Sequence, residues 1–427
     1  MIAVFVHQNF PAQYLHIVRR LARKKDNQLY FITQTDQSDI PGVRKLVYKP
    51  DLPAVSSCHS YTSTFDAAVR TGVAVSRVCR ELRDSGVTPD IIVGHCGWGE
   101  TLFIKDVFPN VPLLSYFEFF YHPQGADVGF DSEFAPCVEG DHARLQVRNA
   151  VNRLAFAESD WGHTATAWQR SLFPVAMQAR ISPLHEGVDT AKVKPDPKAW
   201  IKLARDDKIL TRDDEVITYV SRNLEPYRGF HIFMRALPEI LRRRPNAHVL
   251  IVGGDGLSYS DPPPYAGTFR QMLLTELGGT IDLARVHFLG QVAYETYLNV
   301  LQVSSVHVYL TYPFVLSWSF IEAMSAGCVI IGSATPPVLE VLRDRENGLV
   351  VDFFSTEAIC DRVDEVLDDP DRMQPIRDAA RATAIQDFDT TNVTVPRWER
   401  LLNTLADHRL PTKHAPHPGV ATRTNQR

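Results

Sequence analysis

Residues 216–230 read VITYVSRNLEPYRGF. The first six, Val216–Ser221, form the continuous apolar run that is typical of a strand covered on both faces, and the Pro/Gly turn after them opens a helix at Phe230. Arg222 and Arg228 stand on this turn. Guanidinium groups bind phosphate oxygens bidentately, and a helix N-terminus adds its dipole and free N–H groups. The segment therefore predicts an anion site after a strand, with two solvated loop arginines as the alternative.

The same strand–turn–helix pattern recurs along the chain, and it predicts an α/β fold of open, doubly wound sheets. The expected strands of the first half are Ile2–His7, Gln28–Thr33, Arg44–Tyr48, Asp90–His95, Pro112–Glu118 and Ile181–His185, with helices at Ala12–Lys25, Thr62–Asp84 and Ala143–Ala157. Those of the second half are Val216–Ser221, His248–Gly253, Val286–Leu289, Val306–Leu310, Val329–Gly332 and Gly348–Val351, with helices at Phe230–Arg243, Tyr265–Leu277, Ser319–Ala326, Pro337–Arg343 and Thr356–Leu367.

A chain of 427 residues is too long for one core, so two domains are expected. We place the first at 1–195 and the second at 196–378, with a Pro-containing linker at 190–214. Residues 408–427 have no periodicity and are expected to be disordered. Ligands of such sheets bind beyond the carboxyl ends of the strands, so the residues that follow each strand carry the functional prediction.

The composition excludes several classes of protein. A net charge of -5 argues against a nucleic-acid binder. The six cysteines are scattered without zinc spacing, which fits reduced thiols in a cytoplasm. No apolar run is long enough to span a membrane, and the N-terminus resembles a buried strand more than a signal peptide. A cytoplasmic protein is expected.

Two further places in the second half are candidate ligand contacts. Gly253 and Gly254 follow a strand and permit close backbone approach to a ligand, although a tight turn explains them equally well. Glu322 lies one turn inside a helix, where its carboxylate can accept hydrogen bonds from a ribose diol. The alternative is a capping box, Ser319-x-x-Glu322, in which the glutamate satisfies only a backbone N–H.

Five motifs in order make the pattern specific. They are Arg222…Arg228-Gly229, Val252-Gly253-Gly254, Phe288-Leu289-Gly290, Phe320-x-Glu322-Ala323-Met324-x-x-Gly327 and Glu340…Asn347-Gly348-Leu349-Val350. Over nearly the whole chain, this order resembles the retaining glycosyltransferases of family 4 (group 1). The resemblance implies the GT-B fold, with two facing Rossmann-like domains and an inter-domain cleft.

The resemblance also implies roles for particular residues. Arg222 and Arg228 would neutralise the diphosphate of a nucleotide-sugar donor, Glu322 would hold the ribose, and the backbone around Leu289 would lie against the base. Residues 379–407 would form helices that cross back to the first domain. Because arginines serve the leaving diphosphate, no metal or other cofactor is strictly required.

One departure concerns the donor sugar. The family carries two glutamates separated by seven residues, and the first position here is Phe314, which cannot accept a hydrogen bond from a sugar hydroxyl. Contact with the sugar would then depend on the backbone N–H groups of Phe314, Val315, Leu316 and Ser317 and on Ser317 Oγ.

The first half supplies titratable residues at predicted strand ends, namely His7, His95, Glu118 and His122. We expect Glu118 to orient an acceptor hydroxyl or to accept its proton, and His95 is a second candidate catalytic residue at the same rim; an ordinary satisfied histidine is the alternative at each His position. The long segment Phe119–Cys137 mixes aromatic and acidic residues, as a sugar-binding loop or a packed surface loop does.

The expected activity is transfer of a sugar from a nucleotide diphosphate sugar to a hydroxyl of a polysaccharide, glycolipid or small-molecule acceptor. The alternatives are a GT-B sugar-nucleotide epimerase and a non-catalytic nucleotide-sugar binding protein. The basic first helix, with Arg19, Arg20, Arg23, Lys24 and Lys25, favours a solvated face, with peripheral contact at the inner face of a membrane as the alternative.

Overall fold

The computed structural model describes residues 1–51, 58–203, 207–264 and 267–411, which form two compact units. Unit 1 comprises Met1–Pro123, Val138–Gly187 and the chain from Thr390 onward. Unit 2 comprises Gln124–Cys137 and Val188–Asp389. The division between the units thus falls after Gly187, not at residue 195, and a short piece of the first half goes with unit 2. From residue 412 the tail expected to be disordered lies outside the described residues.

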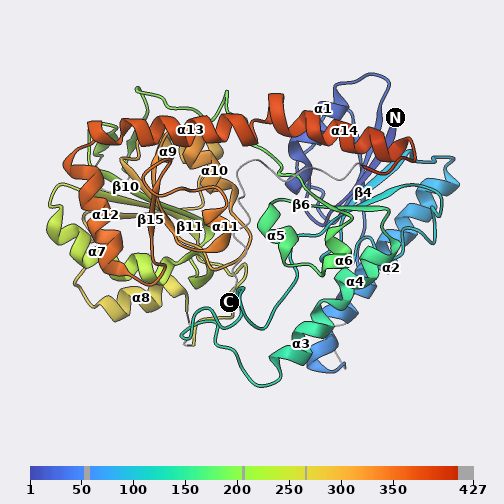
Figure 1. Ribbon diagram of the computed structural model, residues 1–427, viewed down its shortest axis with the longest axis horizontal. Coiled ribbons are helices and arrows are strands. Elements are labelled where there is room, and N and C mark those ends of the chain that lie inside the picture. The colour runs from blue at the N-terminus through green and yellow to red at the C-terminus, as the bar shows by residue number, and fades with distance from the viewer. Residues whose placement is uncertain (52–57, 204–206, 265–266, 412–427) are drawn as a thin grey trace, which may run out of the picture. The chain divides into compact units, whose positions relative to one another are not determined.

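Unit 1 is built on a parallel sheet with the strand order β3-β2-β1-β4-β5-β6-β7 (Figure 1). Its strands are β1 (Ile2–Val6), β2 (Gln28–Thr33), β3 (Val43–Val47), β4 (Ile91–His95), β5 (Leu113–Tyr116), β6 (Trp161–Thr164) and β7 (Ile181–Pro183). Its α-helices are α1 (Leu15–Ala22), α2 (Ser63–Asp84), α3 (Asp141–Arg148), α4 (Ala150–Glu158), α5 (Ala167–Ser171), α6 (Val175–Gln178) and α14 (Val395–Ala406). The order of the strands reverses between β1 and β4, which is the topological switch point.

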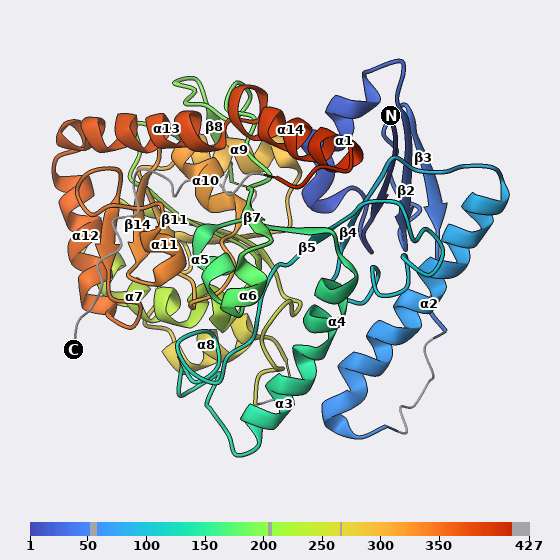
Figure 2. The ribbon, with the colours of Figure 1, turned by 45° about the vertical axis from the view of Figure 1, so that its right-hand side comes forward.

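Alternation along β1 assigns one helix layer to each face of this sheet. Ala3 and Phe5 pack with α1 and with Trp398 of α14, and Val4 and Val6 pack with α2. Figure 2 shows α14 beside α1, with α2 on the other side of the strands. Because both faces are covered, the strands read as nearly continuous apolar runs.

The helix α14 also neutralises part of the basic face of α1. Arg20 Nε lies 3.1 Å and Lys24 Nζ lies 2.8 Å from Glu399 Oε1 of α14. Two of the five basic residues predicted for the first helix therefore form ion pairs within unit 1; of the five, only Arg19 and Arg20 lie in α1, which ends at Ala22. Within the described ranges, no helix combines the length and apolarity that crossing a membrane requires.

Unit 2 repeats the architecture with a parallel sheet in the order β12-β11-β10-β13-β14-β15. Its strands are β10 (Val216–Asn223), β11 (His248–Gly254), β12 (Val286–Gly290), β13 (Val306–Tyr309), β14 (Val329–Ser333) and β15 (Leu349–Val351). Its α-helices are α7 (Phe230–Arg243), α8 (Phe269–Leu277), α9 (Tyr294–Gln302), α10 (Trp318–Ser325), α11 (Pro336–Leu339), α12 (Thr356–Asp368) and α13 (Gln374–Phe388). The two sheets confirm the predicted class of two Rossmann-like doubly wound domains.

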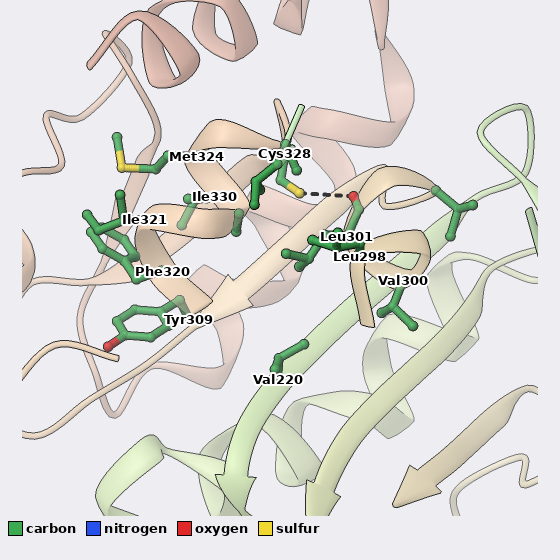
Figure 3. Close-up of a cluster of buried hydrophobic side chains, with 14 of the residues drawn as sticks. Val220, Leu298, Val300, Leu301, Tyr309, Phe320, Ile321, Met324, Cys328 and Ile330 are labelled. Atoms are coloured by element: carbon green, nitrogen blue, oxygen red, sulfur yellow. Dashed lines mark hydrogen bonds between the residues drawn. The ribbon is translucent and has the colours of Figure 1, made fainter. Parts of the chain in front are cut away.

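The main core of unit 2 holds α9 and α10 against the sheet. Phe320, Ile321 and Met324 of α10 lie over Tyr309 of β13, as Figure 3 shows. Beyond the end of α10, Cys328 Sγ donates to the carbonyl of Leu301 at the end of α9 (3.1 Å). This packing fixes α9 and α10 against the sheet.

Several local predictions were wrong. The expected linker contains a two-stranded antiparallel hairpin, β8 (Trp200–Lys202) and β9 (Ile209–Thr211), whose mixed charges hid its short alternating pattern. Strand β6 and helix α9 were missed, because β6 is only four residues long and α9 is only nine residues long and has two tyrosines. Strand β10 extends to Asn223, so Arg222 lies at the end of the strand and not on the turn.

Candidate active site

The anion site predicted from Arg222 and Arg228 lies at the topological switch point of unit 2. Strand β10 pairs with β11 on one side and with β13 on the other, so the order of strands reverses between β10 and β13. Arg222 stands at the carboxyl end of β10, where its side chain is exposed and forms no hydrogen bond or ion pair with the described residues. It is a cation available to a ligand at this edge.

Arg228 has a different environment from Arg222. It ends a short 3-10 helix, Pro226–Arg228, and is only 7% exposed. Its Nη1 donates to Thr311 Oγ1 (2.8 Å) and to the carbonyl of Val315 (2.8 Å), both in the loop after β13. One arginine of the pair is thus exposed, and the other ties the β10 and β13 loops together.

The guanidinium of Arg228 stays charged despite its burial. Burial alone lowers the pKa of Arg228, but the neighbouring Tyr309, Tyr259 and Glu225 outweigh it and raise the pKa. Glu225 also fixes the loop after β11, since its Oε2 accepts from the backbone amides of residues 258–260 at 2.9–3.2 Å. These bonds place Tyr259 with its ring 5.4 Å from Cζ of Arg228.

The turn into α7 depends on Gly229. Its φ of 66° is left-handed, and a Cβ there would collide with Leu310. This backbone reversal starts α7 at Phe230, directly after Arg228. The first N–H groups of a 14-residue helix therefore follow the buried arginine.

The loop after β13 holds the residues expected to contact a donor sugar. Phe314 is buried, with its ring edge-on to Tyr227 (5.3 Å) and near Tyr259 (4.9 Å). The backbone N–H of Ser317 donates to Tyr309 OH (2.8 Å), and Ser317 Oγ caps α10. The prediction that Ser317 is available to a sugar is therefore wrong for its amide, whereas the amides of Val315 and Leu316 form no hydrogen bond with the described residues.

Glu322 does not form the capping box that was the alternative for it. The N-cap of α10 is Ser317, and both oxygens of Glu322 accept from tyrosines of α9: Oε1 from Tyr294 OH and Oε2 from Tyr297 OH, each at 2.6 Å. Burial raises the pKa of Glu322, and the two tyrosines oppose that shift. The contacts of Glu322 with Tyr294 and Tyr297 could not be predicted from the sequence, because α9 itself was not recognised.

Gly254 and Leu289 lie at the ends of neighbouring strands. The carbonyl of Gly254 accepts from the amide of Leu224 (2.8 Å), and a Cβ on Gly254 would lie 2.8 Å from Asn223 Oδ1 and 2.9 Å from Gln291 Nε2. Leu289 is half-buried and packs on the main core of unit 2. Both residues therefore have a packing role at this edge.

Unit 1 has a polar cluster at its own switch point. His7 follows β1, and His95 ends β4. The two rings lie 5.1 Å apart, and Trp98 stacks on His95 at 4.1 Å. Nδ1 of each histidine accepts from the backbone amide two residues later, Asn9 or Gly97. In the neutral ring the proton therefore lies on Nε2.

Glu118 lies beside His95 in this cluster, but His122, which was expected at the same rim, is not part of it. Glu118 Oε2 lies 3.6 Å from His95 Nε2, and the Glu118 side chain is 28% exposed. His122 Nε2 instead contacts the carbonyl of Leu172 (2.6 Å). His163, which the sequence did not single out, stacks on Tyr116 at 4.7 Å, and burial lowers its pKa well below the usual value.

Glu100 is a second buried group that sequence analysis passed over. Its side chain is 0% exposed, and burial raises the pKa of the carboxyl to about 7, against the opposing effects of His95 and nearby backbone amides. The folded chain therefore holds a proton that the unfolded chain, with a pKa of 4.5, has lost. Stability from this group is complete below about pH 4.5 and falls as the pH rises to about 7.

We expect Glu100→Gln to remove this pH dependence. As the pH rises from 4.5 to 8, the free energy of unfolding of the wild type should fall by about 3 kcal/mol relative to that of the variant. Urea unfolding at both pH values measures it. Glu118→Gln, which changes a partly exposed carboxyl, is the matched control; an equal shift in both variants, or in neither, contradicts the prediction.

The described residues contain no group of three or more His, Cys, Asp or Glu side chains placed to hold a metal ion. The structure brings together Arg228, Val315 and Ser317 through Thr311 and Tyr309. In unit 1 it brings together His7, His95 and Glu118. Asp127 and Asp131 of the long loop are buried within unit 2.

Two family models match the chain. Residues 25–193 match the one described as glycosyl transferase family 4 group, and residues 202–383 match the one described as glycosyl transferases group 1. Together they cover most of the chain.

Among curated relatives, a GDP-mannose-dependent alpha-(1-6)-phosphatidylinositol monomannoside mannosyltransferase of Mycobacterium tuberculosis is 29% identical over 278 residues, covering 62% of this chain and 65% of the relative. A D-inositol 3-phosphate glycosyltransferase of Rhodococcus jostii is 27% identical over 197 residues, covering 45% of this chain and 41% of the relative. The chain thus spans less than two thirds of the length of these relatives.

Solved structures share the fold over nearly the whole chain. Sucrose-phosphate synthase of Thermosynechococcus elongatus has a TM-score of 0.70 at 18% identity, covering 96% of this chain and all of that one. HepE of Anabaena in complex with UDP has a TM-score of 0.65 at 16% identity, and the match covers 94% of this chain and all of the HepE chain. These likenesses confirm the GT-B fold class.

Proposed function

Because this chain belongs to the group 1 glycosyltransferases of family 4, we propose that it transfers a hexosyl group from a nucleotide diphosphate sugar to a hydroxyl acceptor with retention of anomeric configuration. The observation that carries the proposal is the pair of cations at the switch point of unit 2. Arg228 is buried and kept charged, and Arg222 is exposed at the end of the adjoining strand.

The chemistry proposed for this pair is electrostatic. As the glycosidic bond breaks, negative charge grows on the departing diphosphate, and prepositioned cations in a partly buried site stabilise that charge. Thr311 and Val315 fix the orientation of Arg228 before any ligand arrives, so little reorganisation accompanies the reaction. With two arginines in this role, turnover should not need a metal ion.

Glu322 is proposed to accept from the ribose hydroxyls of the donor. Its two oxygens are already oriented by Tyr294 and Tyr297, and carboxylate oxygens have lone pairs for further donors. The names of the relatives and structural neighbours give two donor classes to test, GDP-mannose and UDP-linked glucose.

The acceptor is proposed to be a sugar or polyol hydroxyl held by unit 1. Glu118 is its proposed orienting group or base, since its carboxylate is accessible and His95 lies 3.6 Å from it. His95 Nε2 carries the proton in the neutral ring, so it supports the carboxylate and does not compete for the same proton.

Incubation with donor, with and without acceptor, tests the proposal. We expect release of GDP or UDP together with an α-linked product from GDP-mannose or UDP-glucose, unchanged by EDTA and identified by NMR of the anomeric proton. A β-linked product would contradict retention. An altered sugar nucleotide formed from donor alone would identify an epimerase instead.

A second candidate is a nucleotide-sugar binding protein without transferase activity. The observation that favours it is Phe314, whose buried ring occupies the first glutamate position of the family motif. This candidate predicts donor binding in calorimetry, with neither transfer nor slow donor hydrolysis over hours.

A further inference from the structure

Residues 124–137, which we call the strap, belong to unit 2, although the chain on either side of them belongs to unit 1. In Figure 2 this segment is the teal loop beside α8. The contact is built from side chains, since Phe134 of the strap packs on Phe269 of α8 with ring centroids 5.6 Å apart. The strap is therefore a part of unit 2 contributed by a distant stretch of sequence.

Two buried aspartates of the strap accept hydrogen bonds from two tyrosines. Asp127 Oδ2 accepts from Tyr227 OH (2.9 Å). Asp131 Oδ2 accepts from Tyr312 OH and lies 3.1 Å from His231 Nε2. Burial raises the pKa of Asp131, but hydrogen bonds from His231 and Tyr312 outweigh it and lower the pKa to about 2. Asp131 is thus an ionised carboxylate inside unit 2.

Apolar and charged contacts hold the strap in place on both sides of these aspartates. Phe130 packs on Tyr312 and on Phe353, with ring centroids 5.2 and 5.1 Å apart. Glu133 forms a two-fold ion pair with Arg235 of α7, both bonds at 2.7 Å. These anchors touch neither Arg222 nor Arg228.

The two tyrosines belong to the loops that supply Arg228 and its partners. Tyr227 precedes Arg228, and Tyr312 follows Thr311. The carbonyl of Tyr227 accepts from the amide of Tyr312 (3.0 Å), and the two rings lie 4.7 Å apart. Each strap aspartate therefore accepts a hydrogen bond from a tyrosine that is next in sequence to Arg228 or to Thr311. Arg228 and Thr311 are themselves joined by a hydrogen bond.

We propose that Asp127 and Asp131 are positioning residues for the donor site: they hold Tyr227 and Tyr312 and thereby fix the two loops that orient Arg228. The inference rests on the proposed function of Arg228. A loop shift of a fraction of an ångström at this point misdirects the guanidinium that faces the developing charge, and small misplacements of catalytic groups cost large factors in rate.

The test compares Asp131→Asn and Asp127→Asn with Glu133→Gln, which weakens the strap without touching either tyrosine. Thermal melting, kcat and KM for GDP-mannose and UDP-glucose, and calorimetric binding of GDP and UDP are measured for all. We expect both aspartate variants to lower kcat about tenfold and to weaken nucleotide binding. Glu133→Gln should keep the wild-type kcat, since it removes an ion pair of the strap that involves neither tyrosine.

A double-mutant cycle between Asp131→Asn and Tyr312→Phe gives the second readout. If Asp131 acts through Tyr312, the double variant should lose no more kcat than the worse single variant. Wild-type kcat in the folded aspartate variants, or an equal loss of kcat in Glu133→Gln, would overturn the inference. A wild-type protein that binds neither GDP nor UDP would overturn the proposed function instead, and the inference with it.

Discussion

Arg228→Ala is expected to lower kcat/KM for sugar transfer by about a thousandfold, because it removes the buried cation that we propose stabilises the departing diphosphate. It should also lower the melting temperature. Thr311 Oγ1 and the carbonyl of Val315 lose their donor, and a buried polar atom left unsatisfied costs about 1–3 kcal/mol. Both effects follow from one side chain that serves the ligand site and the packing of two loops.

Steady-state kinetics below the melting transition separates the two effects. Arg228→Lys is the matched control, since it keeps a positive charge but lacks the planar fork that binds phosphate oxygens bidentately. We expect its activity to lie between those of the wild type and the alanine variant. A folded Arg228→Ala protein with wild-type kcat/KM would contradict the assignment of the donor site.

Arg222→Ala is expected to lower kcat/KM by about a hundredfold without changing stability. Its side chain is exposed at the end of β10 and forms no bond with the described residues, and such surface substitutions usually change stability by no more than about 0.5 kcal/mol. The loss should fall mainly on nucleotide binding and on the stabilisation of the diphosphate, so calorimetry with GDP or UDP should show weaker binding.

Arg242→Ala provides the comparison for Arg222. Arg242 is an exposed arginine of α7 that pairs with Glu239, so the variant makes the same change of charge on the same unit. It should keep full activity. Equal losses in the two variants would mean that net charge, rather than contact by Arg222, governs donor binding.

The sheets could be predicted from the sequence because parallel strands covered on both faces need continuous apolar runs. Strand β11, with the sequence HVLIVGG, is such a run, and the glycines that end it were recognised as well. The same logic placed Arg222 and Arg228 on the turn after Val216–Ser221, because Pro226 and Gly229 mark that turn, although β10 extends past Arg222 to Asn223. Local signals of this kind depend on residues a few positions apart.

The contacts that could not be predicted from the sequence join residues that are far apart along the chain. Glu322 and Tyr297 are joined only when α9 and α10 pack on the same core, and no local pattern links them. Asp131 and Tyr312 are separated by 181 positions in the sequence. The acidic and aromatic composition of the strap indicated a functional or packed loop, but it could not tell which unit the loop joins.

Because of the strap, residues 188–389 alone do not contain the whole of unit 2. During synthesis, residues 124–137 emerge before any strand of the unit 2 sheet, so the contacts of Asp131 with Tyr312 and His231 form only after those two residues have been made. A fragment limited to residues 188–389 would leave those two side chains without their carboxylate and Phe353 without Phe130. The smallest self-sufficient form of this unit is therefore discontinuous in sequence.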